Sequence, residues 1–340
     1  RFNNSLPVDF MLILFFISSL TMFMSGLVAN YELDFKKIIA LSTLSQLGFM
    51  FSILALGEIN LAFFHLLMHA LFKSLLFMCA GCMIHNLGGC QDIRFMGSLI
   101  NFFPLTSCFF NICNLSLCGI PFLSGFYSKD LILEFMSMGY INIYIFFIYY
   151  ISVGFTVTYS FRLLFFTLLG DFNYSSFFFL NESKIMARSM GILFFFVILG
   201  GGMVSWLVFP TPYYICMPIS MKLMVIFTIL LGVFFSTISL FSNLGDFSIV
   251  WNFYKISFFN LTMWNFSILS SLNMVELILK LGGQSEKSID FGWLEFYGSQ
   301  NLFVRLKINS DYFIKSNFNL KIFLMFILIL VVYLFFYFNS

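Results

Sequence analysis

The sequence predicts an all-α polytopic membrane protein with about eight transmembrane helices, one of them broken, a long lateral surface segment and a C-terminal anchor helix. Three observations support this class. Hydrophobic residues make up 61% of the 340 residues and charged residues only 9%, whereas soluble domains have about 25% charged residues. Apolar runs long enough to cross a bilayer recur along the chain. The basic residues gather in alternate connections between those runs.

The apolar runs set the predicted helices, because about 20 such residues cross the bilayer core. They cover residues 9–30, 36–57, 61–86, 103–136, 141–169, 188–209, 221–242 and 321–338. The fourth run is too long for one crossing, and Gly119, Pro121 and Gly125 oppose a continuous helix within it. We therefore expect a broken helix whose freed carbonyl groups are buried in protein or line a wet cavity.

The basic residues predict an orientation for these spans. If Arg1 lies on side A, only Lys222 joins it there. Side B receives Lys36, Lys37, Arg94, Lys184, Arg188 and the basic residues from Lys255 to Lys321. Such an excess is typical of the cytoplasm-equivalent face, which is the matrix in a mitochondrion.

The segment 243–320 mixes aromatic residues, among them Trp251, Trp264 and Trp293, with charges. This mixture favours an amphipathic helix that lies on side B of the membrane. A loosely ordered loop on the same face is the alternative.

Composition and motifs exclude several classes of function. The net charge of +2 and the lack of a basic run argue against a nucleic-acid partner. Cys79, Cys82 and His85 have a spacing seen among metal ligands, but no second pair completes the set and the segment is apolar. We expect packing thiols, no metal site and no cofactor site in this chain.

Few titratable side chains remain inside the predicted spans, and each needs a reason because a charge at bilayer depth costs a few kcal/mol. These side chains are His65, His69, Lys73, Lys129, Asp130, Glu134 and Arg162. His65, His69 and Lys73 recur every four residues and share one helix face over roughly 12 Å. That stripe suits a proton path, because imidazole titrates near neutral pH; a satisfied core position is the alternative.

A second polar group follows the predicted break. Lys129, Asp130 and Glu134 stand 8, 9 and 13 residues after Pro121, where the ends of a broken helix can hold water and position an ion. Lys129 and Asp130 point about 100° apart and need not pair. Glu134, one turn further toward side A, is either part of this group or interfacial.

Two further polar features favour structural roles. Arg162 lies near the B end of its span, where it can snorkel. The hydroxyl and amide groups of STLSQ, residues 42–46, can bond neighbouring helices or order water.

Four segments occur in one order and resemble NADH dehydrogenase subunit 5, the distal antiporter-like membrane subunit of respiratory complex I. They are DFKKIIALSTLSQLGFM (34–50), HLLMHALFKSLLFMCAGCMIHNL (65–87), QDIRFMGSL (91–99) and GIPFLSGFYSKDLILE (119–134). The likeness is dense over 31–136 and continues in the order of the later spans. The 53 phenylalanines resemble a mitochondrially encoded arthropod version.

The resemblance implies a transporter core of two inverted five-helix repeats plus extra helices, of which this chain contains the ninth to sixteenth. Residues 1–140 would be the second repeat, a proton-channel half that includes the broken helix 103–136. Residues 141–242 would add transmembrane helices, 243–320 a lateral amphipathic segment on the matrix side, and 321–340 a transmembrane anchor. The family's glutamate and lysine of the first repeat have no counterpart here, so an input half-channel is expected to be absent. Ser98 stands where the family usually has glycine.

The resemblance also implies roles and partners. Lys129 would carry the second half-channel, and His65, His69 and Lys73 would relay protons along a hydrated polar axis, with Asp130 and Glu134 as further members. The chain would move protons from matrix to intermembrane space in the mitochondrial inner membrane. NADH, FMN, iron–sulfur clusters and ubiquinone would be used by other subunits. The expected partners are membrane-arm subunits, above all the neighbouring antiporter-like one, and lipids such as cardiolipin.

Two other functions remain open. The first is a subunit of a multisubunit cation/proton antiporter. The second is a structural scaffold of a membrane arm, in which the buried charges only bond helices together.

Overall fold

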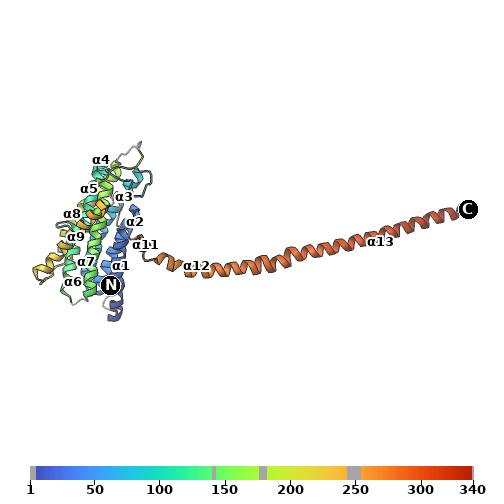
Figure 1. The fold of residues 1–340 in the computed structure, drawn as a ribbon, viewed down its shortest axis with the longest axis horizontal. Coiled ribbons are helices and arrows are strands. Elements are labelled where there is room, and N and C mark those ends of the chain that lie inside the picture. The colour runs from blue at the N-terminus through green and yellow to red at the C-terminus, as the bar shows by residue number, and fades with distance from the viewer. Residues whose placement is uncertain (1–4, 140–142, 176–181, 243–253, 339–340) are drawn as a thin grey trace. The chain divides into compact units, whose positions relative to one another are not determined.

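A bundle of long helices forms the first of two units in the computed structural model, which describes residues 5–139, 143–175, 182–242 and 254–338 (Figure 1). The units are Arg1–Asn265 and Phe266–Ser340. The first three long helices are α1 (Val8–Ala29), α2 (Phe35–Ala55) and α3 (Ile59–Asn86). They confirm the first three predicted spans to within two residues at each end.

The fourth span is broken where the sequence predicts a break. A short helix, α4 (Leu99–Phe102), precedes α5 (Pro104–Cys118), and the chain resumes as α6 (Ser124–Met138). Gly119 ends α5 in the left-handed conformation, with φ +83°, which glycine adopts without steric cost. Proline at the first position of α5 is favourable, because that amide has no partner within a helix.

Three further long helices of the bundle follow the predicted spans. They are α7 (Ile143–Leu164) with a π-helical continuation η2 (Phe165–Leu169), α8 (Lys184–Val208) and α9 (Ile219–Ser242). The short α11 (Tyr254–Leu261) lies in the segment predicted to be lateral. In the described part of the chain, seven helical runs are long and apolar enough to cross a membrane. The pair α5 and α6, each too short alone, supplies a further crossing.

Contacts between connections group them at two ends of the bundle, as alternating spans require. At one end, the Phe35 amide donates to the Gln91 carbonyl at 2.8 Å and the Ile93 amide to the Leu33 carbonyl at 3.1 Å. Arg94 in the same region hydrogen-bonds Asp92 and lowers the pKa of that carboxyl group. At the other end, burial and the hydrogen bond with Glu58 raise the pKa of Tyr213 to about 12. Which end faces the matrix stays a prediction.

A carboxylate from one connection caps a helix of the broken span. Glu182 Oε1 accepts hydrogen bonds from the amides of Leu105 and Thr106, both at 3.1 Å. The first amides of a helix lack partners within it, and the positive end of its dipole favours a negative charge. Glu182 therefore fixes the start of α5, and the length of this helix then sets where the break at Gly119 lies.

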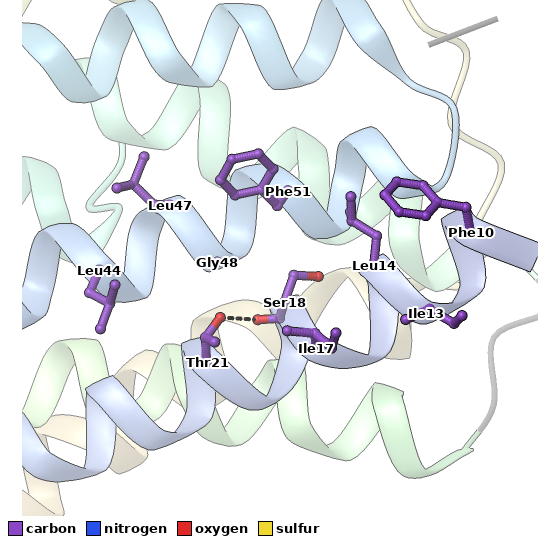
Figure 2. A pocket seen from close by; sticks show the side chains of 10 residues that line it. All are labelled: Phe10, Ile13, Leu14, Ile17, Ser18, Thr21, Leu44, Leu47, Gly48 and Phe51. Carbon is purple, nitrogen blue, oxygen red and sulfur yellow. Dashed lines mark hydrogen bonds between the residues drawn. The ribbon is translucent and has the colours of Figure 1, made fainter. Parts of the chain in front are cut away.

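Helices α1 and α2 approach closely because residue 48 is glycine. A Cβ atom at Gly48 would lie 2.9 Å from the Ser18 carbonyl oxygen and 2.9 Å from Thr21 Oγ1. Figure 2 shows Gly48 opposite Ser18 and Thr21, with the Thr21 hydroxyl bonded to the Ser18 carbonyl. The two helices form an apolar groove around this contact, lined by Phe10, Ile13, Leu14, Ile17, Ser18, Thr21, Leu44, Leu47, Gly48 and Phe51.

Ser98 adopts a backbone conformation that explains why its family counterpart is usually glycine. Its φ of +45° and ψ of +26° lie in the left-handed region, which costs a residue with a Cβ atom roughly 1–2 kcal/mol. The residue precedes α4 and its neighbour Gly97 packs directly against the Asp171 carbonyl group, so the conformation is imposed by the surrounding loops.

The second unit is a nearly uninterrupted helical run. It comprises α12 (Phe266–Ser285), the π-helical segments η3 (Glu286–Leu294) and η4 (Phe296–Gln300), and α13 (Asn301–Phe338). Its 73 residues span roughly 110 Å at 1.5 Å per residue. The described part of the predicted lateral segment is thus mostly helix, with a turn at residues 262–265, and α13 runs from it into the anchor without a break at residue 320. Trp251 lies outside the described residues, and Trp264 lies in the turn before α12.

We expect Gly48→Ala to destabilise the bundle by about 1–3 kcal/mol, since the new methyl group would overlap backbone atoms of α1. The measurement is the thermal denaturation midpoint of the solubilised protein. Gly81→Ala in α3 is the matched control, because no atom lies within 4 Å of a Cβ atom there and alanine favours helix by about 1 kcal/mol. Equal midpoints for the two variants would contradict the close α1–α2 contact.

Candidate functional site

The predicted stripe on α3 is buried in the bundle. His65, His69 and Lys73 expose between 1% and 8% of their surface, and the two imidazole ring centroids lie 6.3 Å apart. Apolar side chains of α3 fill the space beside the stripe, and Phe72 meets the His69 ring edge-on at 5.3 Å. The one-face arrangement expected from a spacing of four is therefore present, and the face points into protein rather than lipid.

His65 joins three helices through both of its ring nitrogens. Nδ1 lies 3.0 Å from the Ser128 hydroxyl of α6, and Nε2 lies 3.3 Å from Gln46 Oε1 of α2. An amide oxygen only accepts hydrogen bonds, so Nε2 is the donor in this arrangement. The Ser128 hydroxyl has one hydrogen, which it can donate either to His65 Nδ1 or to the Gly125 carbonyl oxygen at 3.3 Å. His65 therefore links α2 and α6 through its two ring nitrogens.

Lys73 is held at the far end of the stripe by α2. Its ammonium donates to the Ser42 hydroxyl oxygen, whose own hydrogen is donated to the Ile39 carbonyl at 2.7 Å. Ser42 therefore only accepts from the lysine. The segment 42–46 thus contacts both ends of the stripe. These contacts favour the interpretation that STLSQ bonds neighbouring helices, and they also place Ser42 and Gln46 next to titratable side chains.

His69 stands between these two fixed groups and has a free nitrogen. Its Nε2 is buried, and among the described residues no hydrogen-bond partner lies within reach. Buried polar atoms are nearly always paired in folded proteins, so an unpaired one indicates strain, a bound water or a functional role.

Lys129 reaches back to the break that precedes its own helix. Its ammonium lies 3.3 Å from the Leu117 carbonyl oxygen of α5 and 2.8 Å from Thr156 Oγ1 of α7. Only 4% of the residue is exposed. The expectation that freed carbonyl groups find partners inside the protein holds for Leu117, whereas Pro121 and Phe122 of the connection face outward.

Asp130 and Glu134 are half-buried on α6, one turn apart and hence on one face. Neither forms an ion pair with Lys129. The ion pairs found among the described residues, Lys37–Asp34, Arg94–Asp92 and Lys280–Glu276, all lie away from this region. Both carboxyl groups follow Lys129 toward the Met138 end of α6, the predicted side A.

The structure brings the stripe on α3 against the helix that carries the second predicted group, because His65 contacts Ser128 of α6 at 3.0 Å. Lys129 is the next residue of α6, and its side chain points about 100° away from that of Ser128, toward Leu117 and Thr156. Ser128 and Thr156 were missed by the sequence analysis. A signal existed for the second, because Ser152, Thr156 and Ser160 recur every four residues in an apolar helix and all three are buried.

Arg162 serves the joint between two helices, in agreement with its predicted structural role. Its guanidinium donates to the carbonyl oxygen of Asn30, the residue that caps the C-terminus of α1, and lies 5.9 Å from the centre of the Phe166 ring. A cation at a helix C-terminus is favourable, because the last carbonyl groups lack partners and carry partial negative charge.

The cysteines near the stripe contact core atoms. Cys79 and Cys82 are buried, Cys79 Sγ lies 3.6 Å from Met190 Sδ, and Asn86 contacts Cys82 Sγ. Within the described residues, no group of three His, Cys, Asp or Glu side chains could hold a metal ion.

Two protein-family models match the chain in succession. The model described as NADH:quinone oxidoreductase/Mrp antiporter, TM, matches residues 3–156. The model described as NADH dehydrogenase subunit 5 C-terminus matches residues 159–338, more than half of the chain.

Individual proteins give the same result. NADH-ubiquinone oxidoreductase chain 5 of Anopheles gambiae is 50% identical over 96% of this chain and 57% of its own length. The protein of the same name from Lumbricus terrestris is 37% identical over 89% and 53%. A chain of the Mrp complex from Dietzia sp. matches in structure with a TM-score of 0.61 and 20% identity, over 87% of this chain and 33% of its own length, which indicates a shared fold. The chain spans about half the length of the curated relatives it matches.

We expect Arg162→Gln to destabilise the protein by about 1–3 kcal/mol, because the Asn30 carbonyl group loses a charged donor. The check is the shift in thermal denaturation midpoint. Arg188→Gln, at an exposed position of α8, is the control and should stay within about 0.5 kcal/mol. A loss of stability in the control as large as that in Arg162→Gln would show that the joint has no special role.

Proposed function

The chain belongs to the NADH dehydrogenase subunit 5 family, and from that premise we propose that it translocates protons as a membrane subunit of respiratory complex I. The observation that carries the proposal is the buried row of Lys73, His69, His65, Ser128 and Lys129, which crosses from α3 to α6 inside a membrane-spanning bundle. Titratable groups at membrane depth are costly, and they typically mark ion or proton pathways.

In the proposed mechanism, Lys129 holds a proton at the break and exchanges it with the carboxyl groups toward side A. Asp130 and Glu134 lie on that side of Lys129 along α6, so they would carry protons toward the intermembrane space. His65 suits a relay, since its two nitrogens contact groups on different helices and imidazole can accept at one nitrogen while releasing at the other. Lys73 would be the group nearest the preceding part of the pathway.

The driving energy would come from electron transfer in other subunits, and we infer that NADH, FMN, iron–sulfur clusters and ubiquinone bind there. The location would be the mitochondrial inner membrane. Neighbouring membrane-arm subunits, above all an antiporter-like one, and lipids such as cardiolipin would be the partners. The names of the insect relatives support membership of a complex with other membrane subunits, and the large exposed apolar surface of the bundle supports contact with lipid or with such subunits.

A scaffold role is the second candidate, and one observation favours it. Lys73 and Lys129 each have a hydroxyl acceptor from a neighbouring helix, as expected if they only bond helices together. The two candidates differ in whether removal of the charge changes proton movement or only stability. A cation/proton antiporter subunit is a third candidate. It is supported by the fold shared with the Mrp chain and by the family model that covers both kinds of protein, and sodium transport by the chain would favour it.

We expect Lys129→Met in the assembled complex to lower the number of protons moved per NADH oxidised, with NADH oxidation slowed through coupling. Methionine keeps the length of the side chain but cannot hold a proton. The measurement is proton uptake by vesicles containing the complex. Lys222→Met, at an exposed position of α9, is the control. Unchanged pumping in an assembled Lys129→Met complex would leave the scaffold role.

We expect His69→Ala to lower the same ratio, because its unpaired nitrogen is the group best placed to bind a mobile water between Lys73 and His65. His85→Ala, at the exposed end of α3, should pump normally. An unchanged number of protons moved per NADH oxidised in His69→Ala would contradict the relay role and would leave this histidine only its packing contact with Phe72.

A further inference from the structure

The break between α5 and α6 leaves a specific acceptor without its usual donor. In a continuous α-helix the carbonyl of residue 117 accepts from the amide of residue 121. Here Gly119 turns the chain away in the left-handed conformation before that residue is reached, and residue 121 is proline, which has no amide hydrogen. The preceding carbonyl groups are satisfied locally: the Gly119 amide donates to Ser116 at 3.2 Å and the Ile120 amide to Leu115 at 3.3 Å. The Leu117 carbonyl is instead taken by Lys129.

The second acceptor of Lys129 is committed to that role by its own hydrogen bond. The Thr156 hydroxyl donates its single hydrogen to the Val153 carbonyl at 2.7 Å. Its oxygen therefore faces Lys129 only as an acceptor, at 2.8 Å. Both groups around the lysine nitrogen thus require donors, which an ammonium supplies with charge-assisted bonds and a neutral amine supplies more weakly.

Two further features fit an ammonium at this place. The C-terminal end of α5 carries the negative end of the helix dipole. The lysine side chain also passes beside Gly119, where a Cβ atom would be 3.7 Å from Lys129 Cδ, so its stem packs against the residue that ends α5.

We propose that the Leu117 carbonyl and Thr156 form a socket for the charged ammonium of Lys129, and that Thr156 is a positioning residue for this lysine. The inference rests on the proposed function, because it gives that lysine a defined resting place. When Lys129 passes its proton to a carboxyl group toward side A, its hydrogen bonds to the socket weaken, and the neutral side chain is free to leave it.

The neighbouring turn of α7 offers a matched comparison. Ser160 donates to the Val157 carbonyl at 2.8 Å, as Thr156 does to Val153, and lies 2.8 Å from Cys118 Sγ instead of an ammonium. Both residues are buried. Ser160→Ala therefore removes a hydroxyl of the same geometry from the same helix without touching the socket.

The test compares Thr156→Val, Thr156→Ser and Ser160→Ala in the assembled complex, with protons moved per NADH oxidised as the first readout. Valine keeps the shape of threonine and removes the acceptor, so occupancy of the socket should fall by about tenfold or more, the factor for one hydrogen bond to a charged group. Pumping should fall toward that of Lys129→Met. Serine restores the acceptor and should restore pumping, and Ser160→Ala should pump normally.

A structure of the Thr156→Val complex is the second readout, and it does not depend on activity. The Lys129 ammonium is expected to leave hydrogen-bond distance of the Leu117 carbonyl. A lysine that stays in place, or equal pumping by the valine and serine variants, overturns the socket. If Lys129→Met fails to pump while Thr156→Val pumps normally, the socket is wrong and the proposed function stands; if Lys129→Met pumps normally, the proposed function itself is wrong.

Discussion

A membrane interior allows no unpaired backbone group, and the architecture around residues 117–129 depends on that constraint. Each carbonyl group that lacks its helical donor must find another inside the protein. At the break this donor is the side chain of Lys129, which bonds the Leu117 carbonyl oxygen. A buried lysine and a buried, unpaired carbonyl group would each cost free energy alone, and here each satisfies the other. The helix break and the charge within an apolar run therefore compensate each other.

The same principle organises the polar side chains of the neighbouring helices. Hydroxyl groups of α2 and α7 donate their hydrogens to carbonyl groups of their own helix, as Ser42 does to Ile39 and Thr156 to Val153. Their oxygens are thereby turned into acceptors, and both face an ammonium. The serines and threonines scattered along these apolar helices therefore present fixed hydrogen-bond acceptors to the lysine ammonium groups in the bundle interior.

Much of this arrangement could be predicted from the sequence, and the remainder could not for physical reasons. Hydropathy and a spacing of four are properties of single helices, so the spans, the break at Gly119 to Pro121 and the stripe from His65 to Lys73 were within reach. Which helices meet is a property of packing, so the bonds from His65 to Ser128 and from Lys129 to Thr156 required coordinates. The continuous helix through residue 320 was missed because a change in composition from mixed to apolar does not interrupt backbone hydrogen bonding.

The long helix from Phe266 to Phe338 exposes its apolar side chains. None of its described side chains is buried within the unit, so the helix has no core of its own. Its exposed apolar side chains would therefore be covered by lipid or by other molecules. A chain made without such a cover would present an open apolar face along the whole helix and would be prone to aggregate.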